Sequence, residues 1–177
     1  LKIFHNGSNN YIDVAAGSGH LYVRPKNNFY IQDYTNGKVW IAGILNGKTS
    51  LYHNGNEKLE TISTGIKVLG SEGGNAEIEI FGDEGDDNND KWKLMTNANA
   101  NFYLQNYGAG SWQNSILARP TGATELYNTG NLKLATTTTG IDVTGAITAD
   151  DLRTDNSQTF YLTTANDFRF RHTGGTE

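Results

Sequence analysis

The chain has 177 residues and a formal net charge of −5. It lacks the concentration of Lys and Arg with which proteins follow a phosphate backbone, so we expect no nucleic-acid partner. The absence of cysteine excludes disulfides and thiolate metal sites. No apolar run approaches the roughly 18 residues that a membrane helix needs, so we expect no membrane insertion.

The composition predicts an all-β fold of short strands and tight turns. Glycine and asparagine favour turns, and threonine and aromatic residues favour strands. The Glu and Lys residues that usually fill exposed helix faces are sparse. Short alternating stretches, such as Ile78 and Ile80 on either side of Glu79, predict strands with one face inward and one outward.

Asn-Gly pairs close to apolar runs predict hairpin turns, because both residues tolerate the positive φ angles of a tight turn. The four pairs are Asn6-Gly7, Asn36-Gly37, Asn46-Gly47 and Asn54-Gly55. In the second half of the chain, Thr129-Gly130 takes the place of the last pair.

An internal repeat organises the sequence. Residues 51–70 and 126–145 are identical at twelve of twenty aligned positions. Upstream, residues 28–34 match residues 101–107 with an offset that is two residues smaller. The pattern predicts tandem units of about 75 residues, which is typical of elongated arrays rather than of compact enzymes.

We therefore expect a unit at residues 1–70, a joint at 71–77, a second unit at 78–145 and a partial third unit at 146–177. The missing initial methionine suggests a segment of a longer chain. Each unit has only a thin apolar face, so stability requires stacking on neighbours or a core shared between chains. We expect a symmetric oligomer for this reason.

The densest acidic run supplies four candidate metal ligands: Asp83, Asp86, Asp87 and Asp90. Carboxylates on a tight loop can bind Ca²⁺, although this spacing does not fit an EF-hand loop. The alternative is a solvated turn between two strands, with Trp92 beginning the second strand.

Three histidines stand just before a turn, at His5, His53 and His172. In a symmetric trimer, copies near the axis could bind a metal ion. The alternative is a turn residue that hydrogen-bonds locally, and Asn128 at the equivalent place in the second unit favours that alternative.

Four aromatic residues near the longer loops are candidates for ligand binding: Tyr34, Trp40, Tyr107 and Trp112. Exposed rings can stack on the faces of sugars. The alternative is packing between strands or chains, where large rings are usually found. The sequence shows no nucleophile motif, zinc motif or phosphate loop, so we expect neither an enzyme nor a cofactor.

Several phrases resemble the tail-fibre and virion structural proteins of marine tailed bacteriophages, particularly cyanophage-like ones. They are LKIFHNGSNNYI with GHLYV, SLYHNGNEKLETISTGIKVLG, FGDEGDDNNDKWKL, and ELYNTGNLKLATTTTGIDVTG. This resemblance implies a homotrimeric, intertwined β-rich fibre located in the virion and extracellular once released. Its partners would be its own copies, other tail or virion proteins, and a glycan or protein of the host surface.

The function implied is that of a shaft or connector in a tail fibre, linking the virion to host-surface recognition. Three alternatives remain open at the sequence level. The chain could be a receptor- or glycan-binding module of the fibre, a tailspike-type depolymerase, or a bacterial surface adhesin. A depolymerase would need two carboxylates at a set separation, and no such pair is selected by the sequence.

Overall fold

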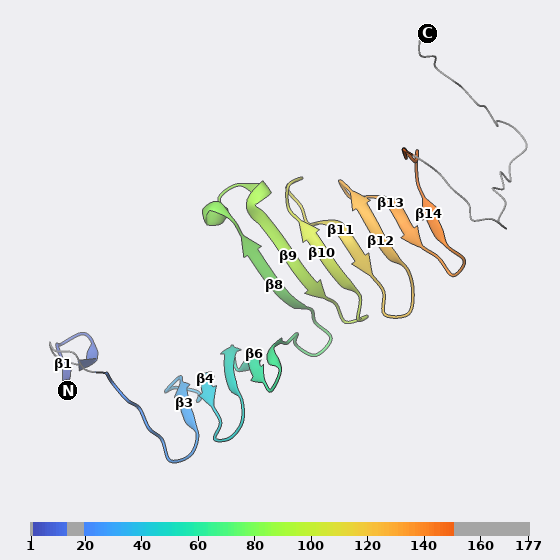
Figure 1. Ribbon diagram of the computed structural model, residues 1–177. Helices are drawn as coiled ribbons and strands as arrows, with labels where there is room; N and C mark the ends of the chain where they lie inside the picture. The colour runs from blue at the N-terminus through green and yellow to red at the C-terminus, as the bar shows by residue number, and fades with distance from the viewer. Residues whose placement is uncertain (1, 14–19, 151–177) are drawn as a thin grey trace, which may run out of the picture.

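The computed structural model describes residues 2–13 and 20–150, and strands make up 49 % of these residues. The prediction of an all-β chain is confirmed, because the described part holds fourteen strands and no α-helix (Figure 1). The strands form three antiparallel sheets of two, five and seven strands. Within each sheet every strand pairs with its neighbour in the sequence, so the chain folds as consecutive hairpins.

Two sheets come from the first predicted unit, residues 1–70. The two-stranded sheet consists of β1 (Lys2–His5) and β2 (Asn10–Asp13). The five-stranded sheet consists, in spatial order, of β3 (Phe29–Gln32), β4 (Val39–Gly43), β5 (Thr49–His53), β6 (Asn56–Ile62) and β7 (Gly65–Val68).

The seven-stranded sheet begins within the predicted joint. Its strands are β8 (Ala76–Phe81), β9 (Lys91–Thr96), β10 (Phe102–Asn106), β11 (Gln113–Ala118), β12 (Thr124–Asn128), β13 (Asn131–Thr136) and β14 (Ile141–Val143). Two short 3₁₀ turns, Asp83–Gly85 and Asn88–Asp90, lie between β8 and β9. In the predicted third unit, residues 146–150 contain no strand, and the remainder lies outside the described residues.

All four Asn-Gly pairs lie in connections between paired strands. Asn54 and Gly55 join β5 to β6 with φ angles of 51° and 79°. Two successive positive φ angles are the signature of a type I′ turn, whose twist matches that of a hairpin. Thr129 and Gly130 have φ angles of 50° and 73° between β12 and β13, so the two turns share one conformation.

The segments β3–β7 and β10–β14 share their irregularities as well as their strand order. A register shift follows Leu51 in β5 and Leu126 in β12. Another follows Ile31 in β3 and Leu104 in β10. Hydrogen bonds from a threonine N–H to a threonine Oγ1, both 2.9 Å long, also recur: Thr49 to Thr61 and Thr124 to Thr136.

The registers also locate the length difference between the two segments. Gln32 lies opposite Val39, whereas Gln105 lies opposite Asn114. The additional residues of the second segment therefore lie in the connection between β10 and β11. A hairpin loop accepts such an insertion because its backbone faces solvent.

Neither larger sheet carries a second layer within the described residues (Figure 1). The buried residues of this part are two apolar ones, Ala42 and Leu117, and three polar ones, Ser50, Glu60 and Lys93. Ala42, Ser50 and Glu60 lie opposite one another on neighbouring strands, so they share a face. The described chain therefore lacks the apolar core that would hold two layers together.

Replacing Thr129 by asparagine is expected to stabilise the turn between β12 and β13. A φ of 50° crowds the β-branched side chain of Thr129 but suits asparagine, the residue at Asn54 in the equivalent turn. We expect Thr129→Asn to raise the free energy of unfolding by about 0.5–1 kcal/mol, and Asn54→Thr to lower it by a similar amount. Urea denaturation measures both changes, and identical stabilities would contradict the strain argument.

Candidate functional site

A continuous row of aliphatic side chains crosses each of the larger sheets. Residues directly opposite each other in an antiparallel pair point to the same face. In the seven-stranded sheet the row takes one residue from each strand: Ile78, Leu94, Leu104, Ile116, Leu126, Leu134 and Val143. In the five-stranded sheet it consists of Ile31, Ile41, Leu51, Leu59 and Val68. We name each row an aliphatic ladder, and the face that carries it the ladder face.

The aliphatic ladders are not covered by the described chain. None of their members is buried, and Leu51 and Leu126, at equivalent places, are 45 % and 41 % exposed. Trp92, on the ladder face beside this row, is also exposed. The ladder face is therefore an extensive apolar surface open to solvent.

The two ladder faces adjoin where β7 meets β8. A hollow at this junction is lined by Ile66 and Val68 of β7 together with Ile78, Leu94 and Phe102 of the seven-stranded sheet. Val68, Ile78 and Leu94 are themselves members of the aliphatic ladders. The apolar surface thus continues from one sheet to the next.

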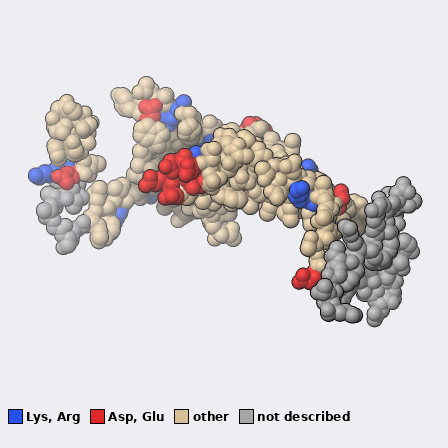
Figure 2. Space-filling model, turned by 90° about the horizontal axis from the view of Figure 1, so that it is seen from above, with Lys and Arg blue, Asp and Glu red and all other residues tan. Residues whose placement is uncertain are grey.

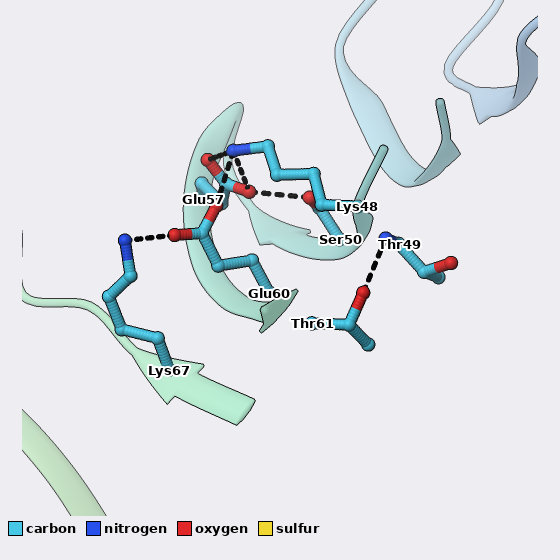
Figure 3. Close-up of polar contacts among 7 residues, drawn as sticks. All are labelled: Lys48, Thr49, Ser50, Glu57, Glu60, Thr61 and Lys67. Carbon is cyan, nitrogen blue, oxygen red and sulfur yellow. Dashed lines mark hydrogen bonds and ion pairs between the residues drawn. The ribbon is translucent and has the colours of Figure 1, made fainter. Parts of the chain in front are cut away.

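The opposite face of the five-stranded sheet carries a cluster of charged side chains (Figure 3). Lys48 Nζ lies 2.6 Å from a carboxylate oxygen of Glu57 and 2.5 Å from Glu60 Oε2. Lys67 pairs with the other oxygen of Glu60, and Ser50 Oγ donates a 2.5 Å hydrogen bond to Glu57. We name the face that carries this cluster the polar face.

A β-bulge brings the two carboxylates of the cluster together. Glu57 and Glu60 are three residues apart, so regular alternation would put them on opposite faces of β6. The register shift makes Glu57 lie opposite Tyr52 and Glu60 opposite Ser50, two residues apart on β5. Both carboxylates therefore point to the polar face, within reach of Lys48.

The lysines hold Glu60 in its charged form. Hydrogen bonds from Lys48 and Lys67 lower the pKa of Glu60 from its ordinary 4.5 to about 2. Hydrogen bonds to Glu57 and Glu60 raise the pKa of Lys48 above its ordinary value. Glu60 and Lys48 therefore remain charged at neutral pH, and the cluster satisfies its own hydrogen-bonding groups.

On the polar face of the seven-stranded sheet, different residues pair the charged and hydrogen-bonding groups. Arg119 Nη1 lies 2.7 Å from Glu125 Oε1, and the hydroxyl of Tyr127 donates to the other oxygen of Glu125. These hydrogen bonds, that of Tyr127 first, lower the pKa of Glu125. Glu125 in turn raises the pKa values of Tyr127 and Arg119.

Two of the four aromatic candidates pack together on this sheet. The rings of Tyr107 and Trp112 meet edge to face with centroids 5.2 Å apart. The ammonium of the buried Lys93 lies 4.5 Å from the centroid of Trp112. In contrast, Tyr34 in the turn between β3 and β4 and Trp40 in β4 are both exposed. The structure therefore does not bring the four candidates together, and it gives Tyr107 and Trp112 a packing role.

The acidic loop forms a compact patch at one end of β8 and β9 (Figure 2). Carboxylate oxygens of Asp86, Asp87 and Asp90 lie within 4.8 Å of one another, whereas Asp83 is not part of this group. Asp87 and Asp90 form a capping box, in which each side chain accepts a hydrogen bond from the backbone N–H of the other. This capping box explains their approach without a metal ion.

Two of the three histidines considered as metal ligands, His5 and His53, bond within their own hairpins. A ring nitrogen of His5 lies 3.2 Å from Asn10 Oδ1, and one of His53 lies 3.1 Å from Asn54 Nδ2. These contacts are those expected of a turn residue that hydrogen-bonds locally, which is the alternative to metal binding near a trimer axis. His172 lies outside the described residues.

The aliphatic ladders were not identified from the sequence. Their signal is the period-two alternation of apolar residues within a strand, as at Ile66 and Val68 or at Ile78 and Ile80. Alternation shows that each strand has an apolar side, but the alignment of those sides across a sheet depends on register. The bulges change that register at positions that composition does not reveal.

No known protein family matches the chain, and no curated protein or solved structure is significantly similar to it. Among residues 2–13 and 20–150, no helix has the length and hydrophobicity needed to cross a membrane. Function must therefore be inferred from the two faces of the sheets.

The low pKa of Glu60 predicts an acid-sensitive contribution to stability. A carboxylate whose pKa falls on folding stabilises the folded state above its unfolded pKa, and this contribution is lost as the pH falls through the folded pKa. Between pH 4.5 and about 2, we expect the Tm of the wild type to fall more steeply than that of Glu60→Gln. Thermal unfolding followed by circular dichroism at closely spaced pH values measures both slopes.

Glu72→Gln is the matched control, because Glu72 is an exposed glutamate in the turn before β8. This variant should retain the steep wild-type slope. If Glu60→Gln and Glu72→Gln have the same slope, the ion cluster does not contribute to acid sensitivity.

Proposed function

We propose that this chain is a structural segment, a shaft or connector, of a phage tail fibre that links the virion to host-surface recognition. In this proposal copies of the chain assemble through their ladder faces, as a homotrimer, and the chain has no catalytic role. The observation that carries it is the pair of uncovered aliphatic ladders. The resemblance to phage fibre proteins supports the assignment to a virion.

The energy available from covering the aliphatic ladders supports assembly. Burying an exposed aliphatic side chain stabilises by about 1.5–3 kcal/mol, so completing the burial of a half-exposed one contributes roughly 1 kcal/mol. Over the members of both ladders, this amounts to roughly 10 kcal/mol per chain. That is as large as the whole stability of an ordinary domain.

Further copies of this chain are the occupants that best fit the ladder faces. A second ladder face offers rows of the same aliphatic residues, and its polar face already satisfies its own charges. Packing ladder face to ladder face therefore buries apolar surface without burying an unpaired charge. The number of three chains comes from the resemblance to phage fibre proteins. A closed ring of three sheets would also leave no ladder face exposed.

The shared irregularities of the two larger sheets support tandem units. Two copies of one unit would place their bulges and turns at equivalent residues, as observed after Leu51 and Leu126. Repeated units in chain order extend a molecule in one direction. An elongated fibre follows if each unit assembles through its own aliphatic ladder.

Sedimentation and small-angle X-ray scattering test this proposal. We expect an oligomer, with the mass of three chains, whose maximum dimension is much larger than that of a compact protein of equal mass. Electron microscopy should show narrow rods. A compact monomer at micromolar concentration would sink the proposal.

A single charge on the ladder face should prevent assembly. Leu126→Asp places a carboxylate in the surface that the copies share, and burying an unpaired charge is costly. We expect association to weaken at least roughly 100-fold, equivalent to about 3 kcal/mol. Sedimentation velocity across a concentration series measures this change.

Asn114→Asp provides the matched control, because Asn114 lies on the polar face and accepts a hydrogen bond from Gln105. A carboxylate can still accept that bond, so this variant should assemble like the wild type. Equal association of the two variants would show that the ladder face is not the interface.

A further inference from the structure

The five-stranded sheet has an unpaired edge where the seven-stranded sheet has a strand. β3 pairs only with β4 in the described chain, whereas its equivalent, β10, pairs with both β9 and β11. Residues that precede β3 run without secondary structure from residue 20 to 25. Figure 1 shows the chain turning just before β3, with the incoming arm diverging from the strand.

The sequence places residues 20–23 at the position of the last four residues of β9. Asn28-Phe29-Tyr30 matches Asn101-Phe102-Tyr103, which lead into β3 and β10. Counting back from this match aligns three residues with β9: Leu21 with Leu94, Tyr22 with Met95, and Val23 with Thr96. The alternation therefore puts Leu21 on the ladder face, next to Ile31, as Leu94 lies opposite Leu104.

The connecting residues suit the same hairpin turn. Between β9 and β10 the Ala100 N–H bonds to the Asn97 carbonyl, and Ala100 has a φ of 59°. By the same count, Pro25 stands at the second position of the turn and Asn27 at the position of Ala100. Proline favours the second position of a β-turn, and asparagine tolerates positive φ better than alanine.

The exposure of nearby side chains indicates a missing neighbour. Leu21, Tyr22 and Val23 are 50 %, 67 % and 62 % exposed. Ile31 of β3 is 41 % exposed, whereas its equivalent Leu104, which lies beside β9, is half-buried. A strand beside β3 would cover these groups.

We infer that residues 20–23 form an edge strand that pairs antiparallel with β3, with Leu21 opposite Ile31 and Val23 opposite Phe29. The pairing occupies the exposed edge of β3 with a segment of the same chain. It also adds Leu21 to the aliphatic ladder, so both larger sheets present the same apolar row. An occupied edge no longer offers a template for pairing with unrelated chains.

A pair of introduced cysteines tests this register in the full chain, which has no cysteine of its own. Residues opposite each other in an antiparallel pair bring their Cα atoms to about 4.5–5.5 Å, within the range of a disulfide. In a glutathione redox buffer, Leu21→Cys/Ile31→Cys should form an intrachain disulfide roughly 100-fold more readily in native buffer than in urea.

Two further variants complete the experiment. Leu94→Cys/Leu104→Cys, where the pairing exists, is the positive control. Leu21→Cys/Tyr30→Cys is the register control, because Tyr30 points to the opposite face from Ile31, and it should show no such enhancement.

The result decides the inference separately from the proposed function, because the hairpin lies within one chain and oligomeric state is measured by sedimentation. An intrachain disulfide favoured at 21 and 31 but not at 21 and 30 supports the pairing, in a monomer or an oligomer. Equal oxidation in native buffer and urea, or a disulfide between two chains, would overturn it. Circular dichroism of the reduced variants checks that each one folds.

Discussion

The constraint on which the structure depends is that every strand pairs with its neighbour in the sequence. Consecutive hairpins use all fourteen described strands in single layers, and none of them returns to cover a ladder face. A single sheet with a bare apolar face gains too little from its own contacts to be stable in water. Covering the ladder faces is therefore the main stabilisation still open to the described chain, and for this reason we propose assembly through them.

The two faces of each sheet meet different physical demands. On the polar face, Glu60 and Lys93 are buried because charged and aromatic side chains lie across one another. In the described residues no buried side-chain nitrogen or oxygen lacks a hydrogen-bond partner, so this face gains little from a new contact. The ladder face has no such partners and gains by losing water. In the proposed assembly, this difference sets which side of the sheet faces a second copy.

Local structure could be predicted from the sequence, whereas register could not. Alternating residues and Asn-Gly pairs indicated strands and hairpins because each depends on a few adjacent residues. The aliphatic ladders depend on bulges, and the bulge in β6 places Glu57 and Glu60 on one face against simple alternation. The acidic run suggested one site, but its two 3₁₀ turns separate Asp83 from the capping box formed by Asp87 and Asp90.

When the two larger sheets are compared position by position, residues on the ladder face differ less than residues on the polar face. Ladder positions stay aliphatic, as at Leu51 and Leu126, which fits the proposed assembly because a polar group there would be buried between copies. Several polar-face positions change in charge, although Tyr52 and Tyr127 are the same. Glu60 is replaced by Ala135 because Arg119 and other residues satisfy that face differently. If ladder faces turn toward a common axis, the varied face and the unequal loops point outward. Contacts with other molecules then fall to those outward surfaces, while the aliphatic ladders only hold the copies together.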